Sequence, residues 1–271
     1  MTCFIGAIPL IDCSYYVVMD ESNSLEEFEE RDIIDLPQKR YFRQRAHVNP
    51  IADHNIQYPL SPDETKWSKF YDFACSQSTG SPVIRYLDVG CGFGGLLISL
   101  ANELPAGELA LGMEIRTKVS EYVQKRITAL RSQHPGSYGN VWCIRTNAMR
   151  YMPNYFLKGQ LYKMFFLFPD PHFKRTKHKW RIINDALLAE YAYVCAIGAT
   201  VYIATDVREL FDWMSDHFNR HPLFEPLSQN EMTADKMIGL ITSSTEESKK
   251  VERNQGDKFY AAFRRVECKK S

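Results

Sequence analysis

A glycine run between two apolar segments is the first feature that could do chemistry. The stretch Asp88-Val89-Gly90-Cys91-Gly92-Phe93-Gly94-Gly95 follows an apolar run and opens a helical one. Glycine lets the backbone turn sharply and approach a ligand, and the helix start offers unpaired N–H groups. Glu114 ends the next apolar run, where a carboxylate can bind a ribose diol. Gly90, Gly92 and Glu114 predict a cofactor site, although the glycine pattern alone also fits a turn that binds nothing.

A rigid acid followed by a basic loop is the second such feature. Asp170 stands in Phe168-Pro169-Asp170-Pro171, and the flanking prolines fix the backbone that carries its carboxylate. The next residues interleave cations with aromatic rings: Lys174, Arg175, Lys177, His178, Lys179, Trp180 and Arg181. Cations bind phosphate and rings stack on bases, so we expect a polyanion to bind here. The alternatives are a solvated charged loop and, for Asp170, a helix N-cap.

Strands and helices that alternate from residue 83 onward would position both features. Apolar runs predict strands at 83–89, 109–113, 141–145, 161–168, 200–205 and 259–266. Helical periodicity predicts helices at 95–104, 117–132, 182–196 and 207–219, with Gly198 closing the third. Such alternation predicts an α/β fold with a mostly parallel sheet and helices on both faces. Because ligands bind at the carboxyl ends of parallel strands, Asp170 is expected at that edge of the sheet.

Composition limits the class of protein and separates an acidic arm from a domain. The chain has 271 residues, of which 45% are hydrophobic and 24% charged, which excludes collagen, coiled coil and wholesale disorder. Residues 1–35 hold nine acids and one base, which leaves 32 bases and 24 acids, a net charge of +8, in the remainder. We predict a disordered acidic arm over 1–35 and one domain over 36–271. No apolar stretch is long enough to cross a membrane, and the seven cysteines lack zinc-site spacing, which favours reduced thiols and no metal.

Two motifs resemble known families. The order Asp-x-Gly-x-Gly-x-Gly at 88–94 resembles the first motif of S-adenosylmethionine-dependent methyltransferases with a Rossmann-like sheet. That resemblance implies a seven-stranded sheet whose antiparallel end strand would be 259–266. The segment around Asp170 is similar to the tRNA (guanine-N7-)-methyltransferases, closest to the eukaryotic members. Further matches in order and spacing are 36–58, Glu114-Ile115-Arg116, Asn147-Ala148-Met149, Thr205-Asp206 and 245–250. Ser248 and Ala199 depart from the glycines usual in the family.

The resemblance implies that the cofactor is S-adenosylmethionine and the product S-adenosylhomocysteine. It places this cofactor on Gly90, Gly92, Glu114, Ile115, Arg116, Asn147, Ala148, Leu167, Thr245 and Glu247. Residue type alone gives some of these positions simpler uses. Asn147 would serve equally as a turn residue, and Thr245 with Glu247 as a helix cap and a first-turn acid.

For the substrate, the resemblance implies methylation of guanosine N7 in the variable loop of tRNA. Asp170 would stabilise the charge that develops on the purine or accept hydrogen bonds from its N1–H and amino group. These two roles stay open. Further substrate contacts are expected from Arg40, Arg43, Arg45, Lys174, Lys177, His178, Arg181 and Asp206. The alternative for the arginines is an arm that packs on the sheet.

Eukaryotic members of the family work with a WD-repeat β-propeller subunit, so the resemblance implies a heterodimer. It also implies a nuclear location, with the cytoplasm as a second option. Rival hypotheses are an NAD-dependent dehydrogenase, a methyltransferase acting on another RNA or a small molecule, and a non-catalytic RNA-binding scaffold. The intact Gly90, Gly92 and Asp170 argue against the scaffold.

Overall fold

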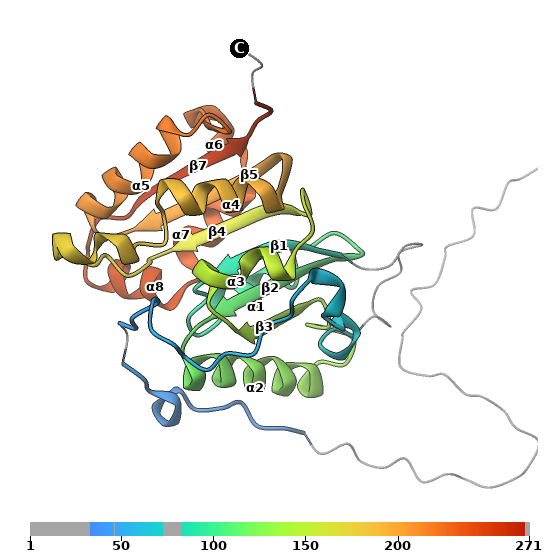
Figure 1. Ribbon diagram of the computed structural model, residues 1–271. Helices are drawn as coiled ribbons and strands as arrows, with labels where there is room; N and C mark the ends of the chain where they lie inside the picture. Colours follow the sequence, from blue (N-terminus) through green and yellow to red (C-terminus); the bar gives the residue numbers. More distant parts are fainter. Residues whose placement is uncertain (1–32, 46, 73–82, 269–271) are drawn as a thin grey trace, which may run out of the picture. The chain divides into compact units, whose positions relative to one another are not determined.

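A seven-stranded sheet forms the centre of the computed structural model, which describes residues 33–45, 47–72 and 83–268 (Figure 1). The strand order is β3-β2-β1-β4-β5-β7-β6. The strands are β1 (Val83–Val89), β2 (Glu108–Glu114), β3 (Val141–Arg145), β4 (Leu161–Leu167), β5 (Cys195–Thr205), β6 (Phe224–Pro226) and β7 (Phe259–Arg265). Strands β1 to β5 run parallel, and β7 is antiparallel to both β5 and β6. The predicted mostly parallel sheet is confirmed, and the predicted antiparallel strand, β7, is the last strand of the chain and lies between β5 and β6.

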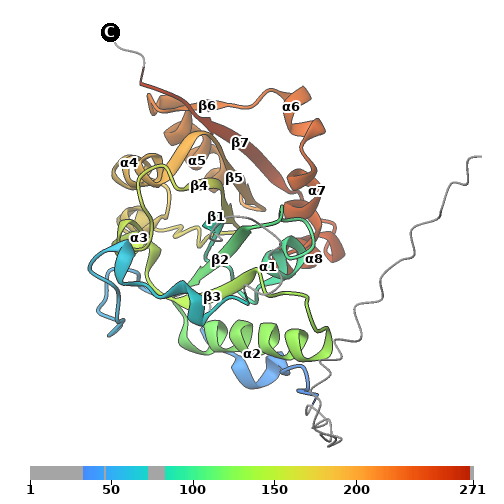
Figure 2. The same cartoon turned by 90° about the vertical axis from the view of Figure 1, so that its right-hand side faces the viewer.

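Helices cover both faces of the sheet, as predicted. They are α1 (Gly95–Leu100), α2 (Thr117–Gln133), α3 (Ala148–Tyr155), α4 (Asp185–Val194), α5 (Arg208–Arg220), α6 (Gln229–Ala234), α7 (Lys236–Ser243) and α8 (Glu246–Arg253). One apolar core lies between the sheet and α3, α4 and α5. The other lies between the sheet and α1, α2 and α7. Figure 2 shows α4 and α5 on one side of the sheet and α1, α7 and α8 on the other.

Strand β1 lies between β2 and β4, where the strand order reverses: the chain places β2 and β3 on one side of β1, and β4 and β5 on the other. Val89, the last residue of β1, is paired with Met113 of β2 and Phe166 of β4. The turns after β1 and β4 therefore begin side by side at the carboxyl edge. In open α/β sheets a crevice forms at such a reversal of strand order, and ligands bind there.

The boundary between α4 and β5 differs from the sequence prediction. The helix ends at Val194 rather than 196, and the strand begins at Cys195 rather than 200. Gly198, predicted to end the helix, instead has φ +84° inside β5, where the register against β4 is irregular. An irregular strand start needs a left-handed residue as much as a helix end does. Four short helices (α3, α6, α7, α8) and β6 were not predicted.

An N-terminal segment, residues 33–62, runs along α2 and then across the carboxyl edge of the sheet (Figure 1). It contains the 3-10 helix η1 (Lys39–Phe42) and ends where η2 (Pro62–Glu64) begins; η3 (Trp67–Lys69) comes next. The Phe42 ring packs edge-on against Tyr122 of α2. Of the predicted acidic arm, residues 1–32 lie outside the described part of the chain.

Within the described residues, no helix has the length and apolar character needed to cross a membrane. No group of three or more His, Cys, Asp or Glu side chains there is arranged to hold a metal ion. Cys91, Cys143 and Cys195 carry free thiols.

Candidate active site

The turn after β1 is built on backbone conformations that favour glycine. Gly90 has φ +74° and donates its N–H to the Met113 carbonyl of β2 at 2.7 Å. Gly92 also has a positive φ, of +53°, and donates its N–H to Glu114 Oε2 at 3.1 Å. The two residues would be strained with a side chain. The turn is thereby fastened to the end of β2, where Glu114 stands.

Glu114 is buried and bound by the arginine two residues later. Its Oε1 accepts from the backbone N–H and Nε of Arg116 at 2.9 and 3.1 Å, and its Oε2 accepts from Arg116 Nη2 at 2.9 Å. Burial by itself would lower the pKa of Arg116, but the hydrogen bonds and charge of Glu114 outweigh it and raise that pKa. The guanidinium of Arg116 thus binds the two Glu114 oxygens that the sequence analysis assigned to a ribose diol.

Asp88 contributes a second buried carboxyl group beneath the turn. Its side chain lies in β1 and is 3% exposed. Burial, and then the nearby charges of Glu114 and Glu246, raises the pKa of Asp88 from 3.8 to about 8. A cation bound at the turn would favour its ionised form.

The chain after β4 forms a rigid loop around Asp170. Phe168 and His172 both have left-handed backbones, with φ +51° and +45°, on either side of Pro169-Asp170-Pro171. Phe168 donates its N–H to the Ala204 carbonyl of β5 at 2.7 Å. Asp170 Oδ1 lies 3.0 Å from His47 Nδ1, which comes from the N-terminal segment. The two flanking prolines and the hydrogen bond from Phe168 to β5 therefore fix the backbone that carries Asp170.

The loop of residues 244–247, called the lid below, packs against the start of α1. Thr245 caps α8, since its Oγ1 accepts the Ser248 N–H at 2.9 Å. Glu246, in the first turn of α8, pairs with Lys39 at 2.7 Å and with Arg126 at 3.5 Å. A methyl group on Gly95 would lie only 2.5 Å from the Ser244 carbonyl oxygen and 3.2 Å from Thr245 Cα. The lid can approach this closely only because residue 95 is glycine.

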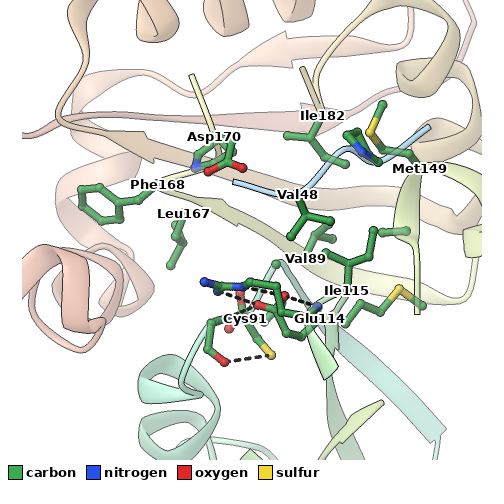
Figure 3. Close-up of a pocket in the computed structure, with 18 of the residues that line it drawn as sticks. Val48, Val89, Cys91, Glu114, Ile115, Met149, Leu167, Phe168, Asp170 and Ile182 are labelled. Atoms are coloured by element: carbon green, nitrogen blue, oxygen red, sulfur yellow. Dashed lines mark hydrogen bonds and ion pairs between the residues drawn. The ribbon is translucent and has the colours of Figure 1, made fainter. Parts of the chain in front are cut away.

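These elements enclose one cleft of about 230 Å³. All ten predicted cofactor residues and Asp170 line it, together with Val48, Pro50, Asp88, His172, Trp180 and Glu246 among others. Figure 3 shows Glu114 and Asp170 on opposite sides of the cleft. Asn147 is also the N-cap of α3, and Thr245 is the N-cap of α8. Both residues therefore have a structural role in addition to their place in the lining of the cleft.

The predicted substrate residues lie outside the lining of this cleft. Arg40, Arg43, Arg45 and Lys174 are exposed, and Lys177 lies with its Nζ 3.5 Å from the centre of the Trp180 ring. Asp206 is exposed just after β5. His178 is directed inward, with Nε2 3.8 Å from Glu209 Oε1 and its ring edge-on to Trp213.

Arg181 requires a correction to the predicted phosphate contact. Its side chain is 1% exposed, donates from Nε to the Pro171 carbonyl at 2.9 Å and pairs with Glu209 at 2.7 Å. A buried guanidinium with these partners cannot reach a phosphate at the surface. Arg181 instead braces the loop that carries Asp170.

His47 and Val48 are among the residues at the site to which sequence reasoning assigned no role. His47 and Val48 come from a segment without periodicity, yet His47 contacts Asp170 and Val48 lines the cleft. Their only signal was membership of the 36–58 match, which assigned no role to either residue.

A strand order of 3-2-1-4-5-7-6, a glycine turn after β1 and an acid after β2 define a methyltransferase of the Rossmann-like α/β class. The model of a family described as "Putative methyltransferase" matches residues 83–261. Three relatives are named tRNA (guanine-N(7)-)-methyltransferase. The one from Danio rerio is 54% identical over 234 residues, which cover 86% of this chain and 97% of the relative. Those from Culex quinquefasciatus and Homo sapiens are 57% identical over 231 residues (85% and 94%) and 53% identical over 246 residues (85% and 89%). The chain belongs to the tRNA (guanine-N7-)-methyltransferase family.

This membership removes the dehydrogenase from the rival hypotheses. Among solved structures, a 16S rRNA methyltransferase, KamB, covers 78% of this chain and 100% of its own, with 17% identity and a TM-score of 0.47.

The close approach of the lid at Gly95 predicts the effect of a single methyl group. In Gly95→Ala, the new Cβ forces the lid away from α1, at a cost of about 1–3 kcal/mol, and we expect the affinity for S-adenosylmethionine to fall by about tenfold. Titration calorimetry measures this affinity. Gly239→Ala, which meets open space in α7, is the matched control and should bind as the wild type does. Equal affinity in both variants would contradict the predicted role of the lid.

The raised pKa of Asp88 predicts a pH-dependent stability. Between about pH 4 and about pH 8 the unfolded chain has this group ionised while the folded chain keeps it protonated, so its contribution to stability is lost as the pH rises through that window. Asp88→Asn should therefore unfold at a higher temperature than the wild type near pH 8 and at a similar temperature near pH 4. Thermal unfolding across this range measures the difference, with the exposed Asp257→Asn as control. Curves that stay parallel for wild type and Asp88→Asn would disprove the assignment.

Proposed function

We propose that this chain transfers the methyl group of S-adenosylmethionine to N7 of a guanosine in the variable loop of tRNA. The observation that carries the proposal is the meeting of Glu114 and Asp170 in one cleft at the β1–β4 edge. The first group suits a nucleoside cofactor and the second a purine base. The names of the relatives, at 53–57% identity, support the substrate.

The residues present fit the cofactor. The cleft is rich in carboxylates (Asp88, Glu114, Asp170, Glu246 and Glu247), which suits a ligand bearing a sulfonium and an ammonium charge. The Glu114 oxygens already accept hydrogen bonds from Arg116, so two ribose hydroxyls can take the place of the guanidinium. Ile115 and Ala148 would border the adenine, and Leu167 the sulfonium end. When bound, the cofactor supplies a methyl group on a positively charged sulfur.

The reaction needs placement more than acid–base chemistry. Guanine N7 is a free lone pair, so no proton has to leave before attack. That lone pair forms the new N–C bond as the S–C bond breaks, and the positive charge passes from sulfur to the purine. Alignment of the two reactants can supply about 7–11 kcal/mol of the barrier. Asp170 stabilises the cationic purine or holds its N1–H and amino group, and either role uses a fixed carboxylate.

Cations around the cleft provide a surface for the phosphates of the RNA. Lys174, Arg175 and Lys179 of the loop after β4 are exposed, as are Arg40, Arg43 and Arg45 of the N-terminal segment. The arginines precede His47 in the sequence, and the cations of the loop follow Asp170. His47 and Asp170 are in contact, so this contact links the two groups. Phosphate binding by such side chains gives a steep dependence on salt, which a small-molecule substrate would not show.

A WD-repeat β-propeller subunit is part of the proposal, as is a nuclear location. Four large apolar side chains are exposed where β4 and β5 begin, at the edge opposite the cleft: Leu157 (55%), Tyr162 (42%), Tyr193 (47%) and Ile197 (63%). Exposed apolar groups of this kind mark protein interfaces. A partner bound there would leave the carboxyl edge open to the tRNA.

The decisive assay is methyl transfer from labelled S-adenosylmethionine to unmodified tRNA, with and without the WD-repeat subunit. Wild type should label N7 of guanosine, and a tRNA with adenosine in place of the variable-loop guanosine should stay unlabelled. Asp170→Asn should lower kcat by about a hundredfold or more while it still binds the cofactor. Cofactor binding without transfer to any tRNA would overturn the proposed substrate.

The basic loop predicts a further difference in the same assay. Replacing both Lys174 and Lys179 by Ala should raise KM for tRNA. The logarithm of the binding constant should also fall less steeply with the logarithm of the salt concentration, with a slope smaller by about one for each lost phosphate contact. Lys66, near the start of β1 on the opposite edge, gives the control variant Lys66→Ala. An unchanged salt slope would rule out the loop as the phosphate contact.

The exposed apolar edge predicts the position of the partner. Tyr193→Asp combined with Ile197→Asp should abolish copurification with the WD-repeat subunit and leave cofactor affinity unchanged. Leu36→Asp alters another exposed apolar side chain (49%) on the N-terminal segment and should copurify normally. Normal copurification of the double variant would exclude this edge as the interface.

A further inference from the structure

We propose that His47 is a positioning residue that orients the Asp170 carboxylate toward the guanine. His47 Nδ1 lies 3.0 Å from Asp170 Oδ1, across 123 positions of sequence. The inference rests on the proposed function, because it assigns His47 a part in placing the base. It makes the N-terminal segment a component of the active site as well as an RNA-binding arm.

The segment that carries His47 is anchored on both sides of it. Before His47, Gln44 Oε1 accepts the Lys118 N–H at the start of α2 at 2.9 Å. After it, the Pro50 carbonyl accepts from Asn147 Nδ2 at 2.6 Å. Asn147 also caps α3 and lines the cleft. His47 is therefore held at the carboxyl edge by elements that follow β2 and β3.

Asp170 needs such a partner because its backbone alone does not orient its carboxylate. The prolines and the left-handed Phe168 and His172 fix the main chain, but the two side-chain torsions of Asp170 stay free to rotate. The side chain is 34% exposed, and no hydrogen bond other than that of His47 joins its carboxylate to another described residue. One bond to Oδ1 selects one carboxylate plane and leaves Oδ2 for the base.

Because His47 is exposed, it has an alternative role as a phosphate contact, and the experiment must distinguish that role from positioning of Asp170. Its side chain is 70% exposed and follows Arg43 and Arg45, so it could bind a phosphate instead. A phosphate contact would change KM for tRNA with a salt dependence. A positioning contact would change kcat, because a misplaced carboxylate acts on the reacting base.

The kinetic test compares His47→Ala, His47→Gln and the same changes in an Asp170→Asn background. His47→Ala should lower kcat by about tenfold, with KM for tRNA and cofactor affinity within about twofold of wild type. His47→Gln should recover part of the loss, because its amide can still donate. In Asp170→Asn the His47→Ala change should have no further effect on kcat. His54→Ala, whose ring hydrogen-bonds to the Asn49 carbonyl of its own segment, is the matched control.

Three kinetic outcomes would overturn the inference. They are a loss confined to KM, a loss that adds fully to that of Asp170→Asn, or a wild-type kcat in His47→Ala.

A measurement that needs no turnover separates this inference from the proposed function. In protein with ¹⁵N-labelled histidine, Asp170→Asn should shift the Nδ1 resonance of His47 and leave that of His54 in place. An unmoved His47 signal would overturn the inference even if tRNA is methylated. If wild type methylates no tRNA, the proposed function fails, and with it the assignment of His47 to guanine placement, whatever the spectrum shows.

Discussion

The parallel pairing of β1 with both β2 and β4 is the constraint on which the site depends. It sets the ends of three strands beside one another, so that the glycine turn, Glu114 and the loop of Asp170 begin within one edge of the sheet. Each of these groups is then fixed by main-chain contacts to a neighbouring strand: Gly90 to the end of β2 and Phe168 to the end of β5. The walls of the cleft are extensions of the sheet, and residues of the lid and of the N-terminal segment complete its lining.

Charge is divided between the inside and the outside of the cleft. Inside, five carboxyl groups and one guanidinium line the cleft, and burial, followed by the charges of Glu114 and Glu246, raises the pKa of Asp88. Such an interior suits a cationic cofactor and the cation that N7 methylation creates. Outside, the lysines and arginines of the loop after β4 and of the N-terminal segment are exposed, where the proposed function places the phosphates of the RNA. Lys39 and Arg126 bridge the two regions, because both pair with Glu246 of the lid.

Local patterns predicted the parts of the fold that local forces decide. The strands β1, β3 and β4 and the helix α2 follow from apolar runs and periodicity, and the glycine turn follows from residue type. The boundary of α4 with β5 was misplaced because Gly198 serves a strand irregularity, which depends on pairing with β4. Arg181 carries the same charge as its neighbours, but its burial against Glu209 comes from packing that sequence does not display. The His47–Asp170 contact joins distant segments, so no spacing pattern could reveal it.

In the proposed function, Glu114 exchanges the guanidinium of Arg116 for the ribose of the cofactor. The most direct test is the affinity of Glu114→Gln for S-adenosylhomocysteine by titration calorimetry, with the exposed Glu121→Gln as control. Loss of a buried charged acceptor should weaken binding by about tenfold to a hundredfold, while the control binds as the wild type does. Wild-type affinity in Glu114→Gln would contradict the placement of the cofactor at the β1–β2 edge and the reaction built on it.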